Sequence, residues 1–195
     1  HSTPRFPLEK DACFPADEQI YAQTFIAISL DSYKAATDIA SQLLREQDPQ
    51  LYGYKLPDDI ETDQSDSIYQ LCKGVAPSAG PLTSQISFQS RGGKSFQSIA
   101  KNRAWGKDFW IDLVGPSLGV DLAVETWRRG KIPGQEDLGD KLDVEDVGGI
   151  DLSPLGVASS WPYTRDHAKW AVEVSSCETR QPDWVCVADI NRQVS

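Results

Sequence analysis

The chain has 195 residues, of which 39% are hydrophobic, and six are tryptophan. This length and composition exclude a disordered chain. The sequence has no run of about 18 apolar residues, so no membrane span is predicted. The net charge of −10 and the pI near 4.6 argue against a nucleic-acid ligand at neutral pH, because phosphate-binding proteins usually carry a basic surface.

The first third of the chain predicts an arm, a strand and a helix. Residues 1–20 are rich in proline and are expected to form an extended N-terminal arm. Residues 21–30 are rich in β-branched and aromatic residues and predict a strand. Asp31 or Ser32 then caps a helix of about a dozen residues, which ends at 48–49. Its apolar positions are Tyr33, Ala36, Ile39, Ala40, Leu43 and Leu44.

The middle of the chain predicts a loop, a strand and a basic turn. Residues 56–67 are acidic and predict a solvated loop, whereas residues 82–90 alternate as a strand. The turn R-G-G-K at 91–94 precedes a helix that is expected to start near Ser95. Free N–H groups at a helix start can meet an anion, so a phosphate site is one interpretation and a plain turn is the other. If DNA crosses this surface, the phosphate contacts are Arg91, Lys94 and Lys101.

The next segment predicts a helix end, a strand and a long connection. Residues 109–113 are apolar and complete a helix that Gly115 and Pro116 are expected to end. Residues 119–129 alternate in polarity, which predicts a strand with one face in water. Residues 131–160 are rich in glycine, proline and acidic residues, and they predict a long surface loop near the substrate.

The C-terminal part carries the residues best suited to catalysis. The chain has two histidines, His1 and His167, and in an extended strand over 166–172 the side chains of His167 and Lys169 share one face. Such a pair suits phosphate chemistry, because the ammonium holds the anion while the imidazole attacks or donates a proton. By spacing alone, a structural histidine is the alternative. A second strand over 184–192 is expected to return beside the first.

The residues of this second strand add a carboxylate and an amide. In an extended strand, Val187, Asp189 and Asn191 share a face, so Asp189 and Asn191 can point toward the same site. Four cysteines, Cys13, Cys72, Cys177 and Cys186, allow three internal pairings. A disulfide between Cys177 and Cys186, which flank the turn between the two strands, is the first expectation. Zinc is disfavoured by the spacing of the cysteines and histidines.

The longer context of these motifs resembles the deoxyribonuclease II family, a branch of the phospholipase D superfamily. D-H-A-K-W-A-V at 166–172 and C-V-A-D-I-N-R at 186–192 are similar to the family's second active-site segment. H-S-T-P-R-F-P at 1–7 resembles its histidine-containing segment. K-S-F-Q-S-I-A-K at 94–101 and the run at 110–130 are similar to its middle part.

The resemblance implies an α/β fold with a phospholipase D-like mixed β-sheet flanked by helices, of which this chain supplies mainly the second pseudo-symmetric half. It implies a metal-independent acid endonuclease with no cofactor, which forms a phosphohistidine and leaves 3′-phosphates. His167 would act as nucleophile or acid, Lys169 and Asn191 would hold the phosphate, and Asp189 would orient a histidine. His1 would be a secondary site residue. A phospholipase and an inactive fold with a binding, storage or toxin role are the alternatives.

The resemblance also implies partners. The first H-x-K motif of the family lies upstream of the segment that matches His1, so we expect this chain to be one piece of a processed protein. Its partners would be the DNA substrate, the N-terminal chain of the same precursor, bonded through Cys13, or a second copy in a homodimer. Activity in acid, where many carboxylates lose their charge, agrees with a lysosomal or secreted location.

Overall fold

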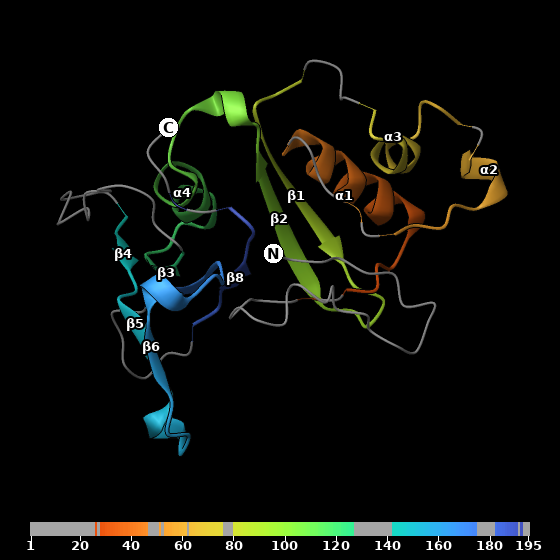
Figure 1. Ribbon diagram of the computed structural model, residues 1–195. Coiled ribbons are helices and arrows are strands. Elements are labelled where there is room, and N and C mark those ends of the chain that lie inside the picture. Colours follow the sequence, from red (N-terminus) through yellow and green to blue (C-terminus); the bar gives the residue numbers. More distant parts are fainter. Residues whose placement is uncertain are drawn as a thin grey trace. The chain divides into compact units, whose positions relative to one another are not determined.

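The computed structural model describes residues 26, 28–46, 51, 53–61, 63–75, 80–126, 142–174, 182–190 and 192. These residues fall into two compact units, one from Ile28 to Gly106 and one beginning at Lys107. Each unit combines helices with β-structure, so the chain has a mixed α/β fold (Figure 1). The arm 1–20 and most of the strand expected over 21–30 lie outside the described residues.

The first unit is built on helix α1 (Tyr33–Arg45), which begins where the sequence predicts. Ser32 is its N-cap, and the Ser32 hydroxyl accepts a hydrogen bond from the Ala35 N–H at 3.2 Å. Ala36, Ala40 and Leu44 of the expected apolar stripe are buried. Tyr33 is not part of the core: it is 54% exposed, and its hydroxyl donates to the Asp66 carboxylate.

The hairpin of β1 (Thr83–Gln89) and β2 (Ser95–Lys101) forms the sheet of this unit. The helix expected from Ser95 is therefore wrong. Seven residues of β2 pair with seven of β1, and the rings of Phe88 and Phe96 stack across the pair at 5.2 Å. Gly93, with φ of +77°, allows the tight turn that brings the strands together. Cross-strand pairing outweighs the weak local helix signal.

Helix α1 packs against this hairpin through a buried polar contact. The Gln42 side-chain amide, only 3% exposed, donates to the Ser98 carbonyl at 3.0 Å and to the Ser84 carbonyl at 3.3 Å. One side chain therefore ties the helix to both strands. Figure 1 shows α1 lying along the hairpin.

Short helices complete the first unit. The acidic segment expected as a loop contains α2 (Asp58–Glu61) and the N-cap of α3 (Ser67–Lys73). That N-cap is Asp66, whose carboxylate accepts from the N–H groups of Ile68 and Tyr69 and so begins a helix inside an acidic stretch. A 3₁₀ turn, η2 (Arg103–Trp105), follows β2.

The second unit contains a four-stranded mixed sheet in the order β4-β3-β7-β8. Its strands are β3 (Leu122–Glu125), β4 (Val144–Asp146), β7 (Trp170–Glu173) and β8 (Val185–Val187). β4 runs parallel to β3, whereas β7 is antiparallel to both β3 and β8. The strand predicted over 119–129 is confirmed for residues 122–125, Gly119 belongs to the end of the preceding helix, and residues 127–129 lie outside the described part of the chain. The return of the C-terminal strand beside the first is confirmed. The buried apolar residues of this sheet are Leu122, Val124, Val144 and Ala171.

The helix before β3 runs further than the sequence predicts. A π-helical turn, η3 (Trp110–Val114), continues directly into α4 (Gly115–Leu118), and the helix ends at Gly119 with φ of +70°. Gly115 and Pro116 thus begin α4 instead of ending a helix. Proline is tolerated in the first turn of a helix, where its missing N–H is not needed.

The segment expected as a loop over 131–160 is structured in its described part. It contains β4 and β5 (Gly149–Asp151), and β5 pairs with β6 (Ser160–Pro162) in a hairpin with η4 (Ser153–Leu155) at its tip. At Gly149 a Cβ would lie 2.8 Å from the Trp161 carbonyl, so the hairpin depends on glycine there. In the described part of the chain, no helix is long and apolar enough to cross a membrane.

Candidate active site

Four chain segments meet at one end of the four-stranded sheet. Because β7 is antiparallel to β3 and β8, and β4 is parallel to β3, the residues before β7 lie at the same end as those that follow the other three strands. The polar residues carried there are His167 and Lys169 before β7, Glu125 and Thr126 at the end of β3, Asp146 at the end of β4, and Asp189 and Arg192 after β8.

The backbone of the H-x-K motif is not a regular strand, because β7 begins only at Trp170. Asp166, 2% exposed, accepts the Ala168 N–H through Oδ1 at 2.8 Å and the Trp161 indole N–H through Oδ2 at 2.7 Å. A carboxylate that bonds the backbone two residues further on forms an Asx turn, which replaces a bond of the strand ladder. The side chains of the motif are therefore placed by this turn.

Lys169 is buried, with only 5% of its surface exposed. Its Nζ donates to the His167 carbonyl at 2.6 Å, and its own carbonyl accepts from the Ala188 N–H at 2.9 Å. His167 is half-buried. An ammonium held in a low-dielectric environment attracts an anion more strongly than one in water. The pair can therefore attract a phosphate and place an imidazole beside it.

The other predicted catalytic residues are placed only in part. Asp189 lies two residues beyond the end of β8 and is exposed, and its neighbour Ala188 is opposite Lys169. Asn191 and His1 lie outside the described residues. The structure thus brings His167, Lys169 and Asp189 to one end of the sheet.

Sequence reasoning missed Arg192, whose side chain is fully buried at the same end of the sheet. Its Nε is 3.1 Å from Asp108 Oδ2, and its Nη1 is 2.8 Å from Asp146 Oδ1. Its backbone N–H donates to the Thr126 hydroxyl at 2.8 Å. The available signal was the place of Arg192 at the end of the C-V-A-D-I-N-R segment that carries Asp189 and Asn191. Arg192 fixes the chain just after Asp189.

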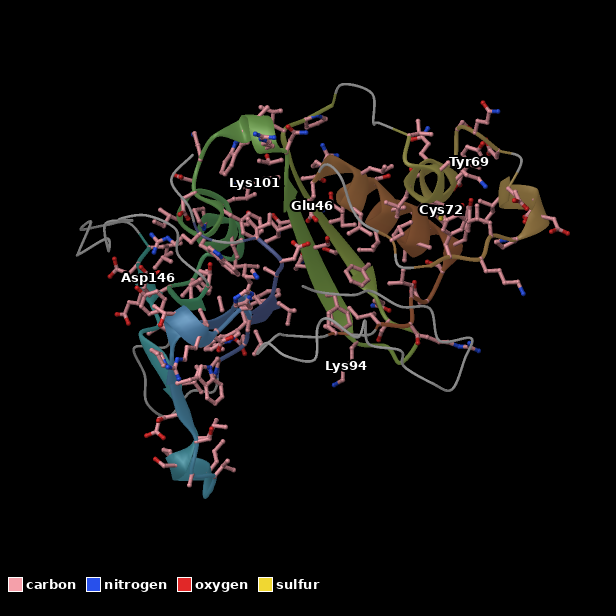
Figure 2. All side chains as sticks on the ribbon, viewed as in Figure 1. Glu46, Tyr69, Cys72, Lys94, Lys101 and Asp146 are labelled. Atoms are coloured by element: carbon pink, nitrogen blue, oxygen red, sulfur yellow. The ribbon has the colours of Figure 1, made fainter. Side chains whose placement is uncertain are left out.

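The predicted DNA-contacting residues lie in the first unit, at two separate places. Arg91 and Lys94 are exposed in the turn of the hairpin, whereas Lys101 is at the opposite end of β2. A seven-residue strand spans roughly 20 Å. Figure 2 shows Lys94 and Lys101 at the two ends of the hairpin. The turn with Arg91 and Lys94 and the opposite end with Lys101 are therefore two separate candidate places for phosphate contact.

The helix start on which the anion site at this turn was based does not form. The N–H of Arg91 donates to the Ser29 carbonyl at 2.7 Å, and that of Lys94 donates to the Ser90 hydroxyl at 3.1 Å. These donors are already used inside the protein. Any attraction for phosphate here comes from the basic side chains. At the other end, the Lys101 ammonium lies 5.7 Å from the centre of the Trp105 ring.

Two of the four cysteines lie among the described residues. Cys186 is a free thiol in the described structure, whereas Cys177, its expected disulfide partner, is not among the described residues, so that pairing stays a prediction. The partner of Cys186 in the sheet is the fully buried Ala171, and burial raises the pKa of the Cys186 thiol to about 11. Cys186 is thus a half-buried thiol that is protonated at neutral pH. Cys72 in α3 is also a free thiol, and its pKa is raised, mainly by burial. Cys13 and Cys177 lie outside the described residues.

Comparison with known proteins finds one matching family and several related proteins. The profile of the family described as deoxyribonuclease II matches residues 1–195. A protein of Burkholderia pseudomallei (strain 1710b), provisionally named deoxyribonuclease-2, is 43% identical over 195 residues, which are 100% of this chain and 52% of the relative. Deoxyribonuclease-2 of Caenorhabditis elegans is 33% identical over 196 residues, 100% of this chain and 49% of the relative.

A third relative has a different name. Plancitoxin-1 of Acanthaster planci is 31% identical over 197 residues, which cover 100% of this chain and 52% of the relative. The chain therefore spans about half the length of these relatives. The family match extends over every segment described above, including the end of the sheet where His167 and Lys169 meet the residues that follow β8. The chain belongs to the deoxyribonuclease II family.

Proposed function

We propose that the protein from which this chain comes is an endonuclease that hydrolyses DNA phosphodiesters at acid pH, without a metal or cofactor. The observation that carries the proposal is the half-buried His167 beside the buried Lys169, in a chain that belongs to this family. A positive charge in a site of low dielectric stabilises the negative charge on the nonbridging phosphate oxygens in the transition state.

The proposed reaction uses two histidines in turn. One imidazole nitrogen attacks phosphorus and forms a phosphohistidine as the bond to the 5′-oxygen of the leaving strand breaks. A second histidine gives that oxygen a proton, then removes a proton from the water that hydrolyses the intermediate, so the product keeps a 3′-phosphate. His167 takes one of these two roles.

The other site residues assist the two histidines. Lys169 holds the nonbridging oxygens together with Asn191, and Asp189 orients a histidine. His1 assists from the N-terminal arm. The DNA backbone is contacted by Arg91, Lys94 and Lys101. These residues lie at the two ends of the hairpin, and that separation matches phosphates about six base pairs apart.

The second histidine comes from outside the part of the chain described here. We infer a phospholipase D-like fold in which a further segment of the precursor supplies the first H-x-K motif across a pseudo-twofold axis. That segment is linked through Cys13, or a second copy of the chain takes its place. The length of the relatives, about twice that of the chain, supports this proposal.

The strongly acidic composition fits work in an acid compartment. At about pH 4.5 many of the 29 carboxylates approach their reference pKa values, so the net charge falls toward zero and repels DNA less. A lysosomal or secreted location follows from this proposal. The name plancitoxin-1 and the engagement of the Lys169 ammonium by the His167 carbonyl support a second candidate, an inactive nuclease fold that acts as a binding, storage or toxin protein.

The test is nicking of supercoiled plasmid by the protein expressed from its complete coding sequence, at about pH 5 in EDTA. His167→Ala and Lys169→Ala should each lower the rate by at least about 100-fold. Lys34→Ala is the matched control, because Lys34 is an exposed lysine on α1. Intact plasmid at every pH from about 4 to about 8 would reject the nuclease. DNA binding without nicking would favour the second candidate.

A further inference from the structure

We infer that Asp166 and Trp161 are positioning residues for the H-x-K motif, an inference that rests on the proposed function. Neither is a member of the motif, and each acts through its neighbour. The two oxygens of Asp166 bond separately to the motif and to a different element. Through Asp166, the direction of the His167 and Lys169 side chains depends on a tryptophan of the β5–β6 hairpin.

The geometry of this link is specific. Asp166 Oδ1 accepts the N–H of Ala168, the central residue of the motif, at 2.8 Å. Asp166 Oδ2 accepts the Trp161 indole N–H at 2.7 Å. With 2% of its surface exposed, Asp166 gains little hydrogen bonding from water. A buried carboxylate needs such donors, and each bond to it is stronger than a bond between neutral groups.

Trp161 is held in place from the other side. It pairs with Ile150 in the hairpin, and the close approach of Gly149 to its carbonyl leaves no room for a side chain. The Tyr163 N–H donates to the Gly148 carbonyl at 3.1 Å, so the chain between Trp161 and Asp166 is also attached to the hairpin. The backbone that carries the indole is therefore held, and the bond of the indole N–H to Oδ2 favours one rotamer of Asp166.

The consequence reaches the two reacting side chains. The Asx turn sets the backbone at His167, and the carbonyl of His167 is the acceptor for the Lys169 ammonium at 2.6 Å. When the bond between Asp166 and Trp161 is lost, the Asp166 carboxylate can rotate. The carbonyl and the imidazole of His167 then move together. A displacement of about 1 Å in a catalytic group can cost on the order of 100-fold in rate.

Two substitutions separate this role from simple folding. Trp161→Phe removes the indole N–H and keeps an aromatic ring. Asp166→Asn keeps the shape but has one acceptor oxygen, so it retains only one of the two bonds. Trp184→Phe, the same ring change in the same unit, is the matched control. Initial rates on a fluorogenic DNA duplex at several concentrations give kcat and KM separately.

We expect Trp161→Phe to lower kcat roughly 10-fold and to change KM by less than about twofold, because the imidazole is misplaced while the DNA contacts remain. Trp161→Phe should add almost nothing in an Asp166→Asn background, because both changes break the same link. Trp184→Phe should leave both constants unchanged. Equal kcat for Trp161→Phe and the wild type overturns the inference, and so does full additivity in the double variant.

A measurement without substrate completes the test. The imidazole NMR signals of His167, assigned with His167→Ala, should shift in Trp161→Phe and stay in place in Trp184→Phe. Unchanged signals in a folded Trp161→Phe variant also overturn the inference while leaving the nuclease proposal intact. A wild type that nicks no DNA rejects the proposed function itself, which is a different result.

Discussion

Loss of the buried guanidinium of Arg192 should destabilise the second unit strongly. In Arg192→Met the carboxylates of Asp108 and Asp146 keep their positions but lose their cation, and both are mostly buried, with side chains 18% and 11% exposed. Breaking a buried ion pair by removing one partner costs about 3–5 kcal/mol, since an uncompensated charge is left in the interior. For a chain of this length that loss lowers Tm by roughly 10 °C.

The experiment compares urea unfolding of the wild type with that of three variants. Arg103→Met, a change at an exposed arginine of η2, is the matched control and should stay within about 0.5 kcal/mol of the wild type. The triple variant Arg192→Met/Asp108→Asn/Asp146→Asn removes the two charges that Arg192→Met strands. It should therefore recover at least about half of the lost unfolding free energy.

Asparagine is chosen at position 108 because Asp108 also caps the following helix. Its Oδ1 accepts the N–H groups of Trp110 and Ile111, each at 2.9 Å, and an amide oxygen can do the same. A loss below about 1 kcal/mol for Arg192→Met would refute the reasoning, as would a triple variant less stable than the single one. The single variant should also nick DNA more slowly, because Arg192 anchors the chain that carries Asp189.

Three further predictions concern single side chains. Gln42→Glu should lower the free energy of unfolding by about 2–3 kcal/mol at neutral pH, because a carboxylate would face carbonyl oxygens. The pKa of the new carboxyl should be raised in the folded state, so the stability is lost as pH rises and returns in acid, where the neutral acid can donate. A urea midpoint that does not change with pH would contradict this. At about pH 8, Cys186 should be alkylated far more slowly in the folded protein than in the protein unfolded in urea, and the rate in the folded protein should rise as pH approaches about 11. Equal rates in the folded and unfolded protein would contradict its raised pKa. The hydrogen bond to Asp66 raises the pKa of Tyr33 to about 12, so Tyr33→Phe should remove the latest component of the phenolate absorbance titration; an unchanged titration would show that the bond is not formed in solution.

Sequence alone determined the features that depend on near neighbours in the chain. Apolar spacing of three and four residues and the serine at position 32 predicted α1 and its start, and alternation predicted β1 and β3. The resemblance of D-H-A-K-W-A-V and C-V-A-D-I-N-R to known sequences pointed to the family, and the two-residue spacing of His167 and Lys169 brought that pair forward as the candidate reactive pair. These signals are local, so no knowledge of the rest of the chain is needed to read them.

The tertiary structure decided what depends on residues far apart in the chain. Residues 95–101 became a strand because β1 offers a partner for every residue, and Pro116 entered a helix because a π-helical turn precedes it. The ion pairs of Arg192 cross 84 and 46 positions, and no periodicity in the sequence encodes them. The burial of Lys169 and the partial burial of Cys186 likewise follow from the order of strands in the sheet. Long-range pairing is set by which surfaces meet, and this is why only the folded chain shows it.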